Sequence, residues 1–339
     1  MLTIYVTKDF DQMSQVAAAL AEERIKACHA RARECVLGLA TGNSPTGMYK
    51  HLAKAFNGKR IDARRVRSFN LDEYVGLPGE HAQQRTLNSN SYGYFMISEL
   101  FCLLQDKFLE TSVPYGVLVE QAKLVEELAA HPEQYAMQGA SRGKAVVIHK
   151  GATGYLREIR EHILDAYQRK IEAAGGIDLQ VIGVGGRGHV AFHESGIPFA
   201  GNSMLLVKLD DNTIENAIQD GNFTSREESP QYAVSMGAEL VYKARTVLLL
   251  ANGARKTGPV AEAILGEVHC DVPISYGQQY AAEGGEMLYV LDEPAAADLL
   301  RAQDKLRAKG YTLVDRRGEA YEKVEHIRFA RDPKTNRLG

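Results

Sequence analysis

The segment LGLATGNSPTGMYKHL, residues 37–52, joins a short apolar run to an amphipathic stretch through a loop of small and polar residues. The apolar run lacks polar alternation, which is typical of a strand buried on both faces of a parallel sheet. Pro45 is well suited to open the helix that follows, because its fixed φ angle matches the first helical turn. The segment therefore predicts one strand–loop–helix unit of an α/β protein.

The same alternation recurs along the chain. Short apolar runs rich in β-branched residues occupy residues 35–39, 66–70, 179–184, 204–209, 246–251 and 287–291. Amphipathic stretches of helical length occupy residues 14–32, 46–56, 155–174, 254–265 and 295–309. Strands that alternate with helices imply βαβ crossovers. We therefore expect an α/β fold of Rossmann-like layout: a doubly wound, mostly parallel open sheet with helices on both faces.

The domain organisation is expected to be simple. No repeat, low-complexity tract or flexible linker divides the sequence, which favours a single α/β domain over residues 1–313. Two regions look like additions to it, an insertion near residues 113–150 and a charged C-terminal extension over residues 314–339. Their strand-like pieces, residues 145–149 and 311–314, are candidates for pairing at a sheet edge.

The composition disfavours several classes of partner. The 339 residues carry a net charge of −3 with basic and acidic side chains interspersed, so no basic stripe for nucleic-acid phosphates stands out. The N-terminal segment lacks the features of a signal peptide, and no apolar run reaches the roughly 18–20 residues needed to cross a bilayer. We expect a cytoplasmic protein that binds neither nucleic acid nor membranes.

The cysteines show no spacing typical of a zinc site or a disulfide framework. They are scattered at Cys28, Cys35, Cys102 and Cys270. His29 and His269 each stand beside a cysteine, but adjacent side chains rarely converge on one ion. We expect free thiols and no metal site.

Ligands of open parallel sheets bind beyond the carboxyl ends of the strands, so the loops that follow the predicted strands are the places to search. In the first of these loops, Gly42 permits a tight turn and the free amides of the helix start favour an anion. Thr41, Asn43 and Ser44 add polar side chains. A phosphate would fit this loop; an ordinary capped strand-to-helix turn is the alternative.

A second loop follows the strand in SFNLDEYVGLPGEH, residues 68–81, and begins with Asp72 and Glu73. A carboxylate at the end of a strand can face a bound ligand and, when partly desolvated, can be tuned as a general base. Asp72 is the candidate base. The alternative is a solvated turn with an Asx-type cap.

A third loop lies in IDLQVIGVGGRGHVAFHES, residues 177–195. Its glycines, Gly185 among them, let the backbone approach a ligand closely. His189 can carry a proton near neutral pH, and Glu194 is placed to orient or charge the imidazole. The glycine spacing differs from the GxGxxG fingerprint of dinucleotide sites.

A fourth loop lies in LLLANGARKTGPVAEAIL, residues 248–265, and carries Lys256. A lysine in the first turn of a helix opposes the helix dipole, so its placement indicates an anionic ligand. A flexible, solvated lysine is the alternative.

In this order the four segments resemble the glucosamine-6-phosphate deaminase family. SFNLDEYVGLPGEH is close to a diagnostic block of that family, TGNSPTGMYKHL resembles its phosphate loop and VGGRGHVAFHE its catalytic loop. NGARK is similar to its lysine-bearing loop, and LDEP, residues 291–294, to its last strand exit. The resemblance covers roughly residues 37–294. The related 6-phosphogluconolactonases share the layout but lack the Asp-Glu-Tyr-Val-Gly-Leu-Pro block.

This resemblance implies an enzyme that opens an aminosugar phosphate, moves a proton between C2 and C1 and releases ammonia, with no metal or organic cofactor. It implies that Asp72 is the base and that His189, supported by Glu194, assists ring opening. The substrate and its phosphate would be held by Thr41, Gly42, Asn43, Ser44, Gly185, Arg187 and Lys256. The resemblance also makes a homo-oligomer the expected state.

Three features depart from the family pattern. Arg187 stands where the family usually carries Asp, two residues before His189. An arginine there would lower the pKa of the imidazole, grip an extra anionic group of the substrate, or neutralise Glu194. Only Gln219 lies near the position of a family phosphate-binding arginine.

Arg226 and Arg255 are the candidates to replace that missing arginine, and residues 82–90 form an insertion relative to the family. The resemblance implies glucosamine 6-phosphate or a close analogue as the substrate, and a sister enzyme acting on a related amino- or keto-sugar phosphate would accommodate the departures. A 6-phosphogluconolactonase-like hydrolase and a non-catalytic sugar-phosphate sensor are the alternatives. The presence of Asp72, His189 and Glu194 together favours catalysis, because a sensor needs no base.

Overall fold

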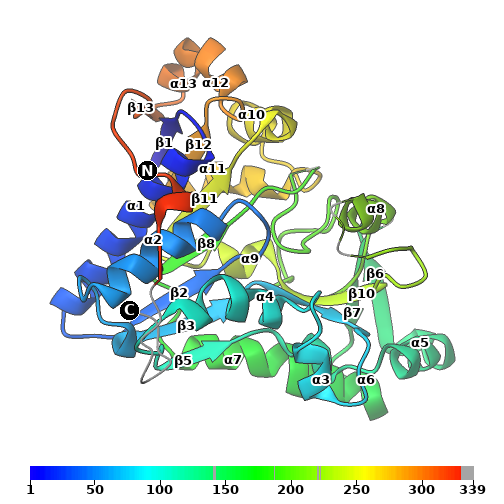
Figure 1. The fold of residues 1–339 in the computed structure, drawn as a ribbon. Helices are drawn as coiled ribbons and strands as arrows, with labels where there is room; N and C mark the ends of the chain where they lie inside the picture. Colours follow the sequence, from blue (N-terminus) through cyan, green and yellow to red (C-terminus); the bar gives the residue numbers. More distant parts are fainter. Residues whose placement is uncertain (140–142, 187, 220, 222, 330–339) are drawn as a thin grey trace.

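An eight-stranded parallel sheet is the main element of the computed structural model, which describes residues 1–139, 143–186, 188–219, 221 and 223–329 (Figure 1). The strand order is β13-β1-β12-β11-β8-β2-β3-β5. The strands are β1 (Leu2–Thr7), β2 (Cys35–Leu39), β3 (Val66–Asn70), β5 (Glu110–Ser112), β8 (Leu179–Ile182), β11 (Thr246–Ala251), β12 (Glu286–Asp292) and β13 (Thr312–Asp315). Every residue of β2, β8 and β11 is buried, which explains their largely apolar sequences, with Gln180 of β8 and Thr246 of β11 as buried polar residues.

Helices cover this sheet, as the sequence predicts. The long helix α1 (Phe10–Ala30) packs on β1, β2, β11 and β12, and on α2 (Thr46–Asn57). In the C-terminal half of the chain, α10 (Thr257–Leu265) packs on α11 (Tyr276–Ala282), and α11 contacts β12. The predicted α/β class, with a mostly parallel sheet and helices on both faces, is confirmed.

A second, five-stranded sheet is antiparallel wherever its strands pair, in the order β4-β10-β9-β7-β6. Its strands are β4 (Asp72–Val75), β6 (Tyr135–Gln138), β7 (Lys144–Ile148), β9 (Met204–Lys208) and β10 (Tyr232–Met236). Residues 204–209 were expected in the parallel sheet, and that placement is wrong. Leu206 of β9 packs in one apolar cluster while Leu205 and Val207 pack in another, so this antiparallel strand is buried on both faces and has no polar alternation.

The chain passes from one sheet to the other through a single residue. β3 ends at Asn70 and β4 begins at Asp72. The intervening Leu71 donates its backbone N–H to Leu39 of β2 and accepts from Met236 of β10 with its carbonyl oxygen. Asp72 therefore lies at the junction of the two sheets.

The described residues of the two regions that the sequence marks as additions, residues 113–150 and 314–339, lie in different parts of the fold. Residues 113–150 contain β6 and β7, and β7 pairs with β9 inside the second sheet, not at an edge. The other strand-like piece forms β13, which pairs with β1 at the edge of the large sheet. Beyond β13 the extension crosses α1 and α2, where Gln12 donates to the carbonyl oxygens of Arg316 and Glu319. The single domain over residues 1–313 stays a prediction.

The remaining helices are short. They are α3 (Ala82–Thr86), α4 (Tyr92–Glu99), α5 (Gln121–Ala130), α6 (Gly154–Glu158), α7 (Asp165–Ala173), α8 (Asp211–Gln219), α9 (Ala238–Val241), α12 (Ala297–Arg301) and α13 (Gln303–Ala308). A π-helical turn, η5 (Ile159–Leu164), joins α6 to α7 within the predicted helical stretch 155–174. Within the described residues, none of the helices is both long and apolar enough to span a bilayer.

Candidate active site

The candidate residues follow the ends of neighbouring strands. Asp72 and Glu73, predicted in a loop, are instead the first residues of β4, one residue beyond the end of β3. β11, β8, β2 and β3 lie side by side in the large sheet and run parallel, so the loops after them share one edge. Two hydrogen bonds join these loops directly. Ser44 Oγ donates to Asn252 Oδ1 at 2.7 Å, and Lys256 Nζ donates to the carbonyl oxygen of Val184 at 2.5 Å.

The loop after β2 prepares the start of α2 for an anion. Gly42 has a φ of +90°, a conformation that L side chains rarely adopt. Pro45 is the residue before the helix, and proline has no side-chain acceptor for the first helical N–H groups. These amides and the hydroxyl of Thr41 are donors that a phosphate could engage, while the Ser44 hydroxyl donates to Asn252 and holds the loop in place.

The loop after β11 positions Lys256 through a carboxylate on the next strand. Gly253 has a φ of +86° and donates its N–H to both carboxylate oxygens of Asp292, at 3.0 and 2.9 Å. Asp292 also accepts from Ala295 at 2.9 Å, and burial raises the pKa of its carboxyl. Asp292 belongs to the LDEP segment. Its carboxylate fixes the turn at Gly253 and so positions the loop that carries Lys256.

Asp72 is buried at the start of β4, with 6% of its surface exposed. Burial raises the pKa of Asp72 well above its usual value, and the charge of Glu73 acts in the same direction. A carboxylate in this state is a stronger base than a solvated one, which suits proton abstraction near neutral pH.

Glu73 has a different role from its neighbour. Its carboxylate accepts from Ser91 Oγ at 2.7 Å and from the backbone N–H groups of Tyr92 and Gly93 at 3.1 and 3.0 Å. Burial raises the pKa of Glu73, while these hydrogen bonds lower it. Glu73 therefore anchors the first turn of α4, a role that the sequence analysis did not identify.

His189 and Glu194 form a pair in the loop after β8. The imidazole Nδ1 lies 3.7 Å from Glu194 Oε2, and Glu194 is almost fully buried. The other carboxylate oxygen of Glu194 accepts from Thr213 Oγ1 at 2.7 Å and from the Asp210 N–H at 3.3 Å. Glu194 is thus held between the imidazole and the start of α8.

Gly185 makes room for this imidazole. A Cβ atom at this position would lie 1.9 Å from His189 Nε2, closer than any real contact allows. The Gly185 N–H donates to the His189 carbonyl oxygen at 3.1 Å, which closes the loop. Glycine is therefore required at position 185 because any side chain there would displace the imidazole.

Backbone contacts connect Asp72 to the histidine loop. Asp72 pairs with Ser235 across β4 and β10, and Ser235 Oγ accepts from the N–H of Phe192 at 3.0 Å. The Phe192 ring stacks on Tyr92 and also contacts Tyr74. Asp72 is therefore connected through Ser235 to Phe192, which lies between His189 and Glu194 in the chain.

The remaining sequence candidates have different places. Arg187 lies outside the described residues. Arg226 forms an ion pair with Asp211 of α8, and its other nitrogen lies 3.7 Å from Glu215, so its charge already faces two carboxylates. His193, close to the catalytic candidates in sequence, is structural. Its ring bonds to the backbone of Ala238 and Ile197, and burial lowers its pKa to about 4.

No family model matches the chain, whereas solved structures share its fold. One is a monomeric glucosamine-6-phosphate deaminase, with a TM-score of 0.64 and 22% identity over 87% of this chain and 99% of that one. Another is the 6-phosphogluconolactonase from Trypanosoma cruzi, with a TM-score of 0.56 and 19% identity over 88% of this chain and 97% of that one. The protein is thus of the α/β class that these two groups of sugar-phosphate proteins share.

Sequence relatives narrow this class to one family. The chain is 34% identical over 313 residues to a glucosamine-6-phosphate deaminase of Clostridioides difficile strain 630, covering 92% of this chain and 100% of the relative. It is 31% identical over 298 residues to that of Clostridium botulinum strain Loch Maree, covering 88% of this chain and 99% of the relative. The chain belongs to the glucosamine-6-phosphate deaminase family, as its motifs indicate.

Proposed function

We propose that this protein is an aminosugar-phosphate deaminase/isomerase. It converts glucosamine 6-phosphate, or a close analogue, and water to a ketose phosphate and ammonia. The observation that carries the proposal is the connection of Asp72, a buried carboxyl of raised pKa, through Ser235 to Phe192, which lies in the loop that holds the His189–Glu194 pair. Membership of the family supports it.

In the proposed reaction His189 assists ring opening by exchanging a proton with the ring oxygen, and Glu194 holds its imidazole. Asp72 then removes the proton from C2 of the open sugar and returns it to C1. Water adds at C2, and the C–N bond breaks to release ammonia and leave the ketone. Every step is a proton transfer or a hydrolysis, so acid and base side chains suffice for it.

The phosphate is proposed to lie against the start of α2, within reach of Thr41, Gly42, Asn43 and Ser44. Lys256, from the neighbouring loop after β11, is proposed to contact the same phosphate. The bond between Ser44 and Asn252 supports this placement, because it holds the two loops side by side. Arg187 is proposed as a further substrate contact on the grounds of sequence alone.

Ammonia release from glucosamine 6-phosphate without added metal tests the proposal, with Asp72→Asn as the inactive comparison. Hydrolysis of 6-phosphogluconolactone without ammonia release would favour the lactonase alternative, which is considered because a 6-phosphogluconolactonase shares this fold. Ligand binding without turnover would favour a sensor.

The oligomeric state and the cellular location are also proposed from the family resemblance. The resemblance makes self-association in the cytoplasm the expected state, although one deaminase of this fold is described as monomeric. The near-neutral net charge of −3 supports a small-molecule substrate over nucleic acid.

A further inference from the structure

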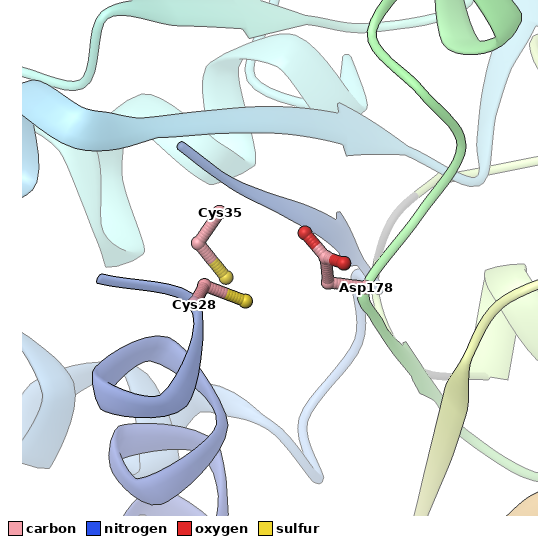
Figure 2. Close-up of side chains that lie close together, drawn as sticks. All are labelled: Cys28, Cys35 and Asp178. Carbon is pink, nitrogen blue, oxygen red and sulfur yellow. The ribbon is translucent and has the colours of Figure 1, made fainter. Parts of the chain in front are cut away.

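A pair of buried thiols lies at the edge of the sheet opposite the candidate active site. Cys28 is near the end of α1, Cys35 opens β2, and Asp178 directly precedes β8. The two sulfur atoms and a carboxylate oxygen of Asp178 all lie within 4.8 Å of one another. Figure 2 shows the two sulfur atoms beside each other, with the Asp178 carboxylate to one side.

Asp178 is already engaged by other groups. One carboxylate oxygen accepts from the Val36 N–H at 2.9 Å and from Arg33 at 2.7 Å, and the other accepts from Arg245 at 2.9 Å. Two cations therefore balance this carboxylate and oppose a metal ion at the same place. The chemistry that remains available in the cluster is that of the two thiols.

The two thiols are not equivalent. The Cys35 thiol donates toward Cys28 and so lowers the pKa of Cys28, and the nearby Arg33 charge helps. The same hydrogen bond, together with burial, raises the pKa of Cys35. Because the thiolate is the attacking species in thiol–disulfide exchange and Cys28 is the less deeply buried thiol, 4% exposed against 0% for Cys35, Cys28 is suited to react first and Cys35 to resolve the product.

An exposed turn joins the two buried cysteines. Cys28 and Cys35 are 4% and 0% exposed, but the turn that joins them contains the exposed residues Arg31, Ala32 and Glu34. Ala32 has a φ of +57°, which is strained for a residue with a side chain. A local opening of this turn, which breaks the ion pair between Arg33 and Asp178, would uncover Cys28.

We propose that Cys28 and Cys35 are a dithiol site that a small-molecule disulfide oxidises to an intramolecular disulfide. The Cys28 thiolate attacks one sulfur of the reagent, whose other half leaves as a thiolate, and a mixed disulfide forms. The Cys35 sulfur then attacks Cys28, loses its proton and displaces the second half of the reagent. The two cysteines lose two electrons and two protons, and the reagent is reduced to two thiols.

The test uses the full chain with Cys102→Ser and Cys270→Ser, which removes the two more exposed thiols. The folded protein is incubated with glutathione disulfide, then denatured, alkylated and cut with trypsin without reduction. Trypsin cleaves after Lys26, Arg31, Arg33 and Lys50, so the two cysteines fall in separate peptides, residues 27–31 and 34–50. Mass spectrometry should find these peptides joined, and reduction should separate them.

Two controls sharpen the result. Cys35→Ser in the same background should accumulate glutathione on Cys28, because no resolving thiol remains, while Cys28→Ser should react more slowly at Cys35. Thermal midpoints of both variants establish that they fold. The kcat of the protein with an oxidised Cys28–Cys35 pair should be unchanged, because the active-site loops lie at the opposite ends of β2 and β8.

Recovery of the two peptides separately, alkylated or each carrying glutathione, overturns the proposal. So does a metal site: if the protein binds one zinc ion that protects both cysteines from oxidation, or shows a cadmium–thiolate charge-transfer band, the cluster is a metal centre instead.

Discussion

Ser44 and Asn252 are 208 positions apart in sequence, yet the Ser44 hydroxyl donates a 2.7 Å hydrogen bond to the Asn252 side chain. This bond ties the loop after β2 to the loop after β11. Both loops carry groups that we assign to the phosphate, so their relative position decides whether one anion can contact both.

Replacing Ser44 with alanine should therefore weaken substrate binding more than catalysis. Loss of one hydrogen bond of this kind costs about 0.5–1.5 kcal/mol, which corresponds to a rise in KM of roughly 2- to 10-fold. Steady-state kinetics measures it, with kcat as the internal control. A fall in kcat at constant KM would place Ser44 in the chemical step instead.

Asp72→Asn and Glu73→Gln should have opposite effects, although the residues are adjacent. Loss of the base should lower kcat by about 10²–10⁴-fold and leave the thermal midpoint unchanged or higher, because a buried carboxylate is costly to ionise. Glu73→Gln should lower the midpoint, because it disrupts the acceptor for the start of α4. Circular dichroism melts and ammonia assays on both variants distinguish these roles, and equal stability loss in the two variants would contradict the assignment.

The pH dependence follows from the raised pKa of Asp72. A base must be ionised, so kcat/KM should rise with pH through a value well above that of an ordinary carboxyl, about 3.9. Linkage has the matching sign: the folded state binds this proton more tightly than the unfolded state, so stability from Asp72 is present below the unfolded pKa and is lost as pH rises through the folded pKa. The stability loss over this window should be smaller in Asp72→Asn. An acid limb near pH 4 would argue against Asp72 as the base.

Gly185→Ala should damage catalysis while Gly186→Ala should not. The first substitution places a Cβ atom 1.9 Å from His189 Nε2, whereas the nearest neighbour of a Cβ at Gly186 is Asn216 Nδ2 at an ordinary 3.6 Å. Because a displacement of about 1 Å can cost on the order of 10²-fold, kcat of Gly185→Ala should fall by that order. Similar kcat values for the two variants would show that the imidazole need not occupy this place.

Much of the candidate site could be predicted because strand exits are visible in sequence. Buried parallel strands are unbroken apolar runs, and the polar residues directly after them, such as Asp72 and His189, are expected at one edge. The roles of Glu73 and Asp292 were missed, because both depend on backbone N–H groups distant in sequence.

The second sheet was missed for a related reason. Pairing of β4 with β10 joins residues 72–75 to residues 232–235, and no local pattern signals such a partner. β9 is buried on both faces, so its sequence resembles that of a parallel strand although it pairs antiparallel.

The proposed reaction, with Asp72 as its base, can be followed by incubating the purified protein with glucosamine 6-phosphate in the presence of a metal chelator and measuring both products. We expect equal amounts of ammonia and ketose phosphate, with both products formed about 10²–10⁴-fold more slowly by Asp72→Asn. Absence of ammonia with glucosamine 6-phosphate and its close analogues, or undiminished release by Asp72→Asn, would contradict it.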